Sequence, residues 1–292
     1  MKVVIWGGTG FIGSHIIKHF LAQGDEVINV SRNVTTNNTI ETLTYSQPGR
    51  IIEALKSADG AIFSAGIRLN QQFSETEYLG NLTLLCEIVN LLKEAGQNNC
   101  VFLSSIGVYG NEDAPWKESS ACHPQNLYAL SKKHQDDLLS WINKHQKAQY
   151  KILRLAQVMG LGERKGYLFN TFFDQASHHH AVTLMGTGSG KRQYIYINDV
   201  VRCIRLMMTF PSLNGIFNVG IEGSISIKDL AKLMHESLNV TQAIKRVAYP
   251  KEDVHTYEMD VSKIEKMAGF CPFYSVRDAI LDIKRTTNRK ES

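Results

Sequence analysis

A tyrosine and a lysine lie one helical turn apart in the segment LYALSKKH, at Tyr128 and Lys132. Side chains at this spacing share one face of a helix. The reference pKa of a phenol is about 10, so a tyrosine that takes a proton at neutral pH needs a pKa lowered by about 3 units, and a nearby ammonium supplies part of that shift. The pair therefore fits a proton-transfer centre. It fits the polar face of an ordinary helix as well, because the spacing is common by chance.

Three glycines, Gly7, Gly10 and Gly13, stand between the apolar run KVVIW and a helical pattern. Glycine lets the backbone turn sharply and approach a phosphate, and the N-terminus of the following helix offers N–H groups and a partial positive charge. This strand–loop–helix arrangement is typical of a dinucleotide-binding loop. A tight turn that binds no ligand is the alternative.

The first half of the chain alternates apolar runs with helical patterns. Strands are predicted at KVVIW, EVINV, GAIFSAG, CVFLSS and YKILRLA, and helices near residues 12–23, 51–57, 78–95 and around Tyr128. Apolar strands separated by helices are typical of a parallel sheet with both faces covered. The predicted fold class is α/β, a Rossmann-type doubly wound parallel sheet with a smaller C-terminal substrate-binding region.

The pattern changes after Leu161, where a glycine-rich segment, GTGSGKR, is followed by the predicted strand GIFNVG and the predicted helix SIKDLAKLMHESLN. We expect residues 1–160 to form the dinucleotide-binding domain, with residues 191–220 returning to it. The substrate-binding region is expected to comprise residues 161–190 and 221–292.

Composition argues against several classes of protein. The 32 basic and 28 acidic residues give a net charge of +4 without a basic block, so no nucleic-acid partner is expected. The sequence shows no apolar run of membrane-spanning length and no signal-peptide pattern. Five cysteines without a CxxC pair predict reduced thiols and a cytoplasmic location. The consecutive histidines 178–180 cannot all converge on one ion, so no metal site is predicted.

Several motifs together resemble a known family. GGTGFIG, LSSIGVYG, YALSK, ILRLAQVMG and RQYIYINDVV occur in the order seen in extended short-chain dehydrogenases/reductases, and the chain looks like a member of their NAD-dependent epimerase/dehydratase group. The segment MDVSKIEKMAGFCP is similar to the C-terminal signature of that group, so the resemblance runs nearly end to end. It implies an NAD(P)-dependent oxidoreductase or epimerase.

The resemblance places a catalytic triad on Ser105, Tyr128 and Lys132. It implies that Tyr128 is the acid/base, that Lys132 lowers its pKa, and that Ser105 holds the substrate oxygen. This favours the proton-transfer centre over the plain polar helix face. The implied cofactor-binding residues are Gly7, Gly10, Phe11, Ile12, Gly13, Ser31, Arg32, Ala65, Gly66, Asn81 and Lys132. For Asn81, a purely structural role at a helix start is an equal alternative.

The positions after Ser105 bear on the type of reaction. Family members that dehydrate sugars carry an Asp-Glu pair there, because eliminating water needs an additional acid and base. This chain has Ile106 and Gly107. A 4,6-dehydratase is therefore not expected, which leaves epimerases, ketoreductases and simple alcohol dehydrogenases.

Arg192 and Gln157 are the predicted substrate-binding residues. Arg192 matches the family arginine that contacts a substrate diphosphate, and Gln157 stands where an asparagine is usual. An exposed loop arginine without a ligand is the alternative. Two departures weigh against a standard nucleotide sugar: Tyr249 replaces a second diphosphate arginine, and no proline follows Arg154.

The end of the second predicted strand bears on the cofactor. NAD-specific folds place an Asp or Glu there to bind the adenosine ribose. Here the strand ends in Ser31-Arg32-Asn33. A guanidinium matches a 2′-phosphate, so NADP(H) is predicted to be favoured over NAD(H). The alternative is that Arg32 stacks on adenine and accepts either cofactor.

The function expected from these observations is an NAD(P)-dependent epimerase or reductase of a nucleotide-linked sugar, acting as a homodimer. In the resembling family two long helices pair with those of a partner, which here are residues 78–95 and 128–144. Two alternatives stay open: a dinucleotide-sensing regulator without turnover, and a reductase of a non-sugar carbonyl. Sensors tend to lack the Tyr/Lys pair that this chain keeps.

Overall fold

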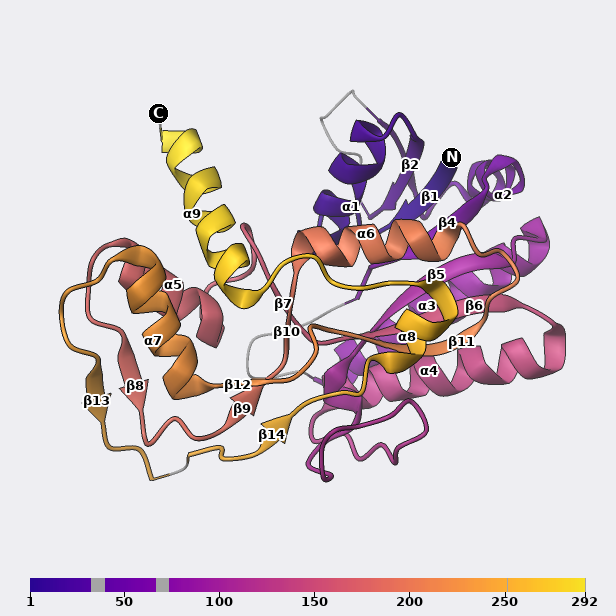
Figure 1. The fold of residues 1–292 in the computed structure, drawn as a ribbon. Helices are drawn as coiled ribbons and strands as arrows, with labels where there is room; N and C mark the ends of the chain where they lie inside the picture. The colour runs from indigo at the N-terminus through magenta and orange to yellow at the C-terminus, as the bar shows by residue number, and fades with distance from the viewer. Residues whose placement is uncertain (33–39, 67–73, 251, 292) are drawn as a thin grey trace.

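A parallel sheet of seven strands lies at the centre of the larger part of the molecule (Figure 1). The computed structural model describes residues 1–32, 40–66, 74–250 and 252–291. The strand order is β11-β6-β5-β4-β1-β2-β3. The strands are β1 (Lys2–Trp6), β2 (Glu26–Ser31), β3 (Glu41–Thr44), β4 (Gly60–Phe63), β5 (Asn99–Ser105), β6 (Gln149–Leu155) and β11 (Gly215–Val219). This confirms the predicted α/β fold with its doubly wound parallel sheet.

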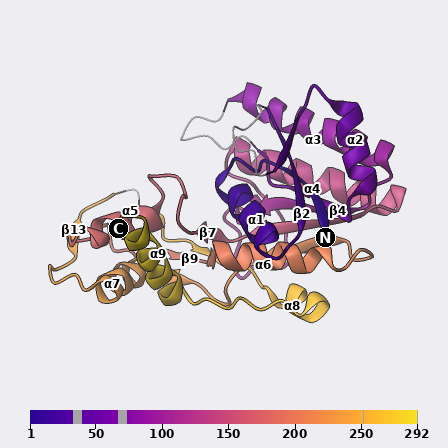
Figure 2. The same ribbon diagram turned by 90° about the horizontal axis from the view of Figure 1, so that it is seen from above.

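Helices cover both faces of this sheet (Figure 2). One face packs against α2 (Pro48–Ser57), α3 (Glu75–Ala95) and α4 (Leu127–Gln146), and the other against α1 (Phe11–Ala22) and α6 (Ile197–Met208). Alternate residues of each strand face opposite layers, because the side chains of a strand alternate in direction. In β1, for example, Val4 and Trp6 join the first layer while Val3 and Ile5 join the second.

Local capping sets where the two long helices begin. Ser74 and Glu77 form a capping box, so α3 begins at Glu75, three residues before the predicted start at residue 78. The Asn126 side chain accepts the Ala129 N–H at 2.9 Å and starts α4 directly before Tyr128. The sequence therefore fixes Tyr128 in the first turn of its helix.

The described residues of the C-terminal part form helices and several short strands. Three of its helices, α5 (Leu168–Ser177), α7 (Ile227–Leu238) and α9 (Val276–Glu291), lie together to one side of the sheet (Figure 1). The short strands are β7 (Gln157–Met159), β8 (Thr183–Met185), β9 (Lys191–Arg192), β10 (Tyr194–Tyr196), β12 (Ile225–Ser226), β13 (Lys245–Val247) and β14 (Thr256–Tyr257). Helix α8 (Ser262–Ala268) packs on β11 of the central sheet, whereas β9 pairs with β12 and β14. The domain division proposed from the sequence stays a prediction.

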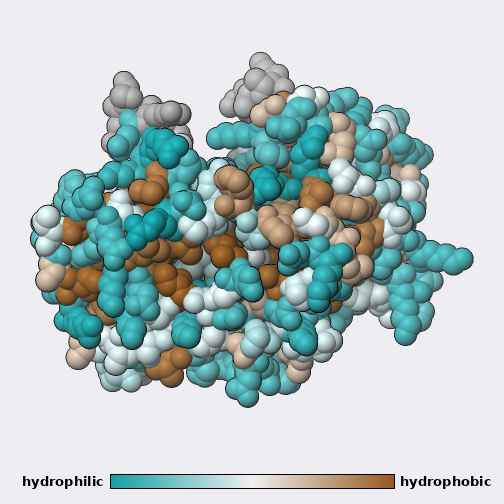
Figure 3. Space-filling model, in the orientation of Figure 1, coloured by the Kyte–Doolittle hydropathy of each residue, from teal (hydrophilic) through white to brown (hydrophobic). Residues whose placement is uncertain are grey.

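The surface is mixed in polarity. On the face drawn in Figure 3, polar side chains cover most of the molecule, with apolar ones in clusters between them. Within the described ranges, no helix has the length and apolar character needed to cross a bilayer. The same residues hold no group of three or more His, Cys, Asp or Glu side chains placed to bind a metal ion. The five cysteines are all free.

Candidate active site

The loop between β1 and α1, together with the first turn of α1, is built so that only glycine fits at two positions. Gly7 has a φ of +86°, and a Cβ there would lie 2.7 Å from the backbone nitrogen of Ala65. A Cβ on Gly13 would collide with the Gly7 carbonyl oxygen. Gly10 starts α1 without a side-chain cap, and the first turn contains no acidic residue. The tight backbone and the uncapped helix start fit the pyrophosphate of a dinucleotide.

Phe11 and Ile12, also predicted to contact the cofactor, form the first turn of α1 and are both partly buried. The Phe11 ring approaches Gly160 and Gly162 in the segment after β7. Beneath the loop, the Gly8 N–H donates to Asn29 Oδ1 at 3.2 Å. Asn29 was not predicted to take part. Asn29 could have been predicted, because it is a polar residue inside the otherwise apolar run VINV.

The end of β2 carries the residues predicted to choose the cofactor. Ser31 is buried and pairs in register with Thr44 of β3, while Arg32 is exposed. Burial raises the pKa of Tyr45, and the nearby Arg32 acts against that rise. A serine and a guanidinium therefore stand where an NAD-specific fold would have a carboxylate. Asn33, the next residue, lies outside the described residues.

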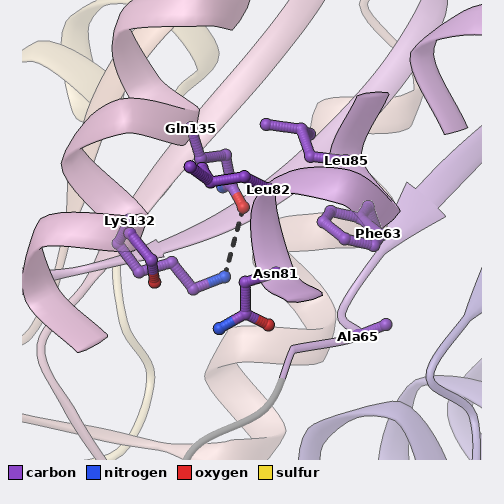
Figure 4. A pocket seen from close by; sticks show the side chains of 8 residues that line it. Phe63, Ala65, Asn81, Leu82, Leu85, Lys132 and Gln135 are labelled. Carbon is purple, nitrogen blue, oxygen red and sulfur yellow. Dashed lines mark hydrogen bonds between the residues drawn. The ribbon is translucent and has the colours of Figure 1, made fainter. Parts of the chain in front are cut away.

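Lys132 is buried, and two of the acceptors that hold its ammonium lie among the described residues. Its Nζ donates to the backbone carbonyl of Leu103 on β5 at 2.9 Å and to Gln135 Oε1 at 3.2 Å. The Gln135 amide also donates to the Leu103 carbonyl, at 3.1 Å. Figure 4 shows Lys132 and Gln135 side by side on α4, facing Asn81 of α3. The ammonium is thus fixed at the carboxyl end of the central sheet.

Ser105 lies at the end of β5, where its Oγ accepts the Gly107 N–H at 3.1 Å. A Cβ on Gly107 would be 3.4 Å from that Oγ and 3.6 Å from the Cβ of Ala129, the residue after Tyr128. The turn η1 (Ile106–Val108) therefore packs against the first turn of α4. Tyr128 is half-buried in that turn. The structure brings the segments of all three predicted triad residues together.

A row of predicted cofactor-binding residues connects the glycine loop to Lys132. Ala65 touches Gly7, as described above. A Cβ on the next residue, Gly66, would lie 3.6 Å from Lys132 Nζ and 3.8 Å from Asn81 Oδ1. Ala65, Asn81 and Lys132 line one small pocket (Figure 4). This continuity suits an extended ligand with one end on the glycine loop and the other beside Lys132.

Gln157 and Arg192 lie near each other on the C-terminal side of the sheet. The Gln157 N–H donates to the carbonyl of Gln193, the residue after Arg192, at 3.1 Å. The Arg192 guanidinium forms an ion pair with Asp253 at 2.7 Å and stacks over the Tyr257 ring at 4.4 Å from its centroid. Burial would raise the pKa of Asp253, but hydrogen bonds from His255 and the charge of Arg192 hold it below its usual value.

Sequence reasoning missed Asp253 and Gln135. Asp253 lies 61 residues from Arg192, and no motif connects them. Gln135 could have been found, because it stands at i+3 from Lys132 and so on the same helix face.

The chain matches a known protein family along most of its length. The model of the "NAD dependent epimerase/dehydratase family" matches residues 3–220. The chain is 26% identical to dTDP-4-dehydro-6-deoxyglucose reductase of Escherichia coli, covering 95% of each chain. It is 25% identical to a putative UDP-glucose 4-epimerase of Methanocaldococcus jannaschii, covering 98% of this chain and 97% of that protein.

Two solved structures share the fold. UDP-N-acetylglucosamine 4-epimerase from Bacillus cereus superposes with a TM-score of 0.87 at 23% identity, covering 98% of this chain and 99% of that one. DesIV, a dTDP-glucose 4,6-dehydratase from Streptomyces venezuelae with NAD and TYD bound, gives a TM-score of 0.84 at 22% identity, covering 100% of this chain and 98% of that one.

Proposed function

The chain belongs to the NAD dependent epimerase/dehydratase family, and we propose that it moves a hydride at a hydroxyl or keto carbon of a nucleotide-linked sugar, with Tyr128 as acid/base. The observation that carries this proposal is the buried Lys132 ammonium of α4, which donates to the Leu103 carbonyl near the carboxyl end of β5, the strand that ends in Ser105. The family's enzymes include epimerases, dehydratases and reductases.

The chain's own residues have distinct roles in the proposed reaction. A bound nicotinamide dinucleotide supplies or accepts the hydride. In the reductive direction Tyr128 gives a proton to the carbonyl oxygen, and in the oxidative direction it takes the hydroxyl proton. Lys132 stabilises the deprotonated phenol by its charge. Ser105 donates a hydrogen bond to the substrate oxygen as charge develops there.

Reduction and epimerisation fit this site better than dehydration. Elimination of water needs an acid and a base beyond Tyr128. Ile106 is buried in the core and Gly107 has no side chain, so the two positions after Ser105 supply neither. Arg32 favours NADP(H), and that preference favours net reduction of a ketone over epimerisation with a retained NAD.

We also propose that the protein is a homodimer formed through α3 and α4. Leu79 on α3 and Trp141 on α4 are 58% and 54% exposed. Large apolar side chains on two neighbouring helices suit a helical interface with a second copy.

Turnover with defined substrates tests the main proposal. The purified protein is mixed with NADPH or NADH and with UDP- or dTDP-linked 4-keto sugars, and cofactor oxidation is followed at 340 nm. Conversion of a 4-keto sugar supports a reductase, and interconversion of 4-hydroxy sugars without net oxidation supports an epimerase. Tight cofactor binding without turnover of any carbonyl would favour the dinucleotide-sensing regulator instead.

One observation favours a second candidate, a reductase of an uncharged, non-sugar carbonyl. Arg192 is already paired with Asp253, and Tyr249 stands where the family has a second diphosphate arginine. A diphosphate would have to compete with a carboxylate of the chain itself. Calorimetric titration with UDP and dTDP separates the two candidates. Binding that is lost in Arg192→Ala supports the nucleotide sugar, and no binding by wild type supports the uncharged substrate.

A further inference from the structure

Gln135, Lys132 and the Leu103 carbonyl form a closed group of three hydrogen bonds. The lysine donates to both partners, and the Gln135 amide donates to the same carbonyl. Gln135 is only 4% exposed, so its amide is committed to this group. Figure 4 draws its hydrogen bond to Lys132. A carbonyl can only accept, which fixes the amide nitrogen on Leu103 and leaves the amide oxygen for Lys132.

Both partners of the ammonium in this group are neutral. A carboxylate in place of the Gln135 amide would form an ion pair with Lys132. Its negative charge would then weaken the effect of the Lys132 charge on nearby ionisable groups. On the same helix, Tyr128 stands one turn before Lys132 and Asp136 one turn after it. Burial raises the pKa of the Asp136 carboxyl, and the charges of Arg154 and Lys132 act against that rise. Asp136 is paired with Arg154 at 2.8 Å, so its charge is largely compensated.

We propose that Gln135 is a positioning residue that anchors the Lys132 ammonium through a neutral amide and so keeps the lysine's charge available to Tyr128. This inference rests on the proposed function, because the charge matters to catalysis only if Tyr128 transfers the proton. A lysine has four rotatable side-chain bonds, and two fixed acceptors select one geometry for it before substrate binds.

The pH profile of kcat/KM, measured in the oxidative direction, tests the proposal with Gln135→Glu and Gln135→Met. The carboxylate of Gln135→Glu opposes ionisation of Tyr128, so the acidic limb should move to higher pH by about one unit. Gln135→Met keeps the volume and removes the anchor, so kcat at saturating cofactor should fall by about tenfold. Melting temperature and cofactor titration show whether each variant is folded.

His134→Glu is the matched control. It adds the same charge one residue earlier on α4, but at an exposed side chain that faces solvent and Tyr78. Solvent screens this charge, so its profile should stay close to that of wild type. The proposal is overturned if the Gln135→Glu profile superimposes on wild type, if His134→Glu shifts it equally, or if Gln135→Met keeps full kcat. Tyr128→Phe distinguishes a failure of the proposed function from a failure of the role given to Gln135. Full turnover in Tyr128→Phe refutes the proposed function itself. Lost turnover in Tyr128→Phe, together with an unshifted Gln135→Glu profile, refutes only the role of Gln135.

Discussion

Arg154 and Asp136 form an ion pair, with Nε and Oδ2 2.8 Å apart and with side chains 3% and 0% exposed. The pair connects β6 to α4 one turn beyond Lys132, and the guanidinium also lies over the Tyr109 ring, 4.8 Å from its centroid. Burial raises the pKa of the Asp136 carboxyl, and the charge of Arg154 acts against that rise. Each partner therefore depends on the other to stay buried and charged.

Arg154→Met should lower the free energy of unfolding by about 3–5 kcal/mol, because it leaves the Asp136 carboxylate buried without its partner. Urea denaturation at neutral pH measures this loss. The double variant Arg154→Met/Asp136→Leu should recover most of the stability, since no uncompensated charge remains. A loss below about 1 kcal/mol in the single variant would mean that the pair does little for stability.

Arg32→Ala should reduce the preference for NADP(H) by about ten- to a hundredfold, because a charge-assisted bond to the 2′-phosphate is lost. Titration of both cofactors against wild type and variant measures the ratio. Arg277→Ala is the control, because it removes an exposed arginine that pairs with Glu236 on α7. Tighter binding of NAD(H) by wild type, or a ratio that Arg32→Ala leaves unchanged, would show the cofactor assignment to be wrong.

Charges on the exposed faces of α3 and α4 should break the proposed dimer. Leu79→Glu combined with Trp141→Glu puts two carboxylates into an interface that would otherwise bury apolar surface. Light scattering at micromolar concentration should show a dimeric mass for wild type and a monomeric mass for the double variant. Phe273→Glu, at a residue 76% exposed outside these helices, should leave the mass unchanged. A monomeric wild type would contradict the assembly.

His235 makes a pH-dependent contribution to stability. Its Nε2 accepts the Val182 N–H at 3.0 Å, which requires a neutral ring, and burial lowers the pKa of His235. A folded pKa below the unfolded value means that this stability is fully present above pH ~6.5 and is lost as pH falls through the folded pKa. His235→Gln keeps an acceptor that does not titrate. Its melting temperature should therefore fall less than that of wild type between pH 7.5 and 5.0, and equal falls would exclude the effect.

Much of the fold could be predicted because it depends on local apolar patterns. The predicted strand KVVIW has the same bounds as β1. The predicted strand EVINV forms β2, which also includes Ser31 at its end. The start of α3 was misplaced because a capping box, which is a side-chain geometry, decides it. The glycine loop and the Tyr128–Lys132 pair were visible because both depend on short spacings. The Arg192–Asp253 pair was not, since it depends on tertiary packing across distant segments.

In the proposed mechanism, Tyr128 transfers the proton while Lys132 stabilises its ionised form. Tyr128→Phe removes only the phenolic oxygen, so fold and cofactor affinity should stay as in wild type. Single-turnover rates, measured with a substrate that wild type accepts and with enzyme saturated in cofactor, are the most direct test. The rate should fall by roughly 10²-fold or more. A nearly unchanged rate would contradict the assignment of Tyr128 and, with it, the mechanism proposed for this site.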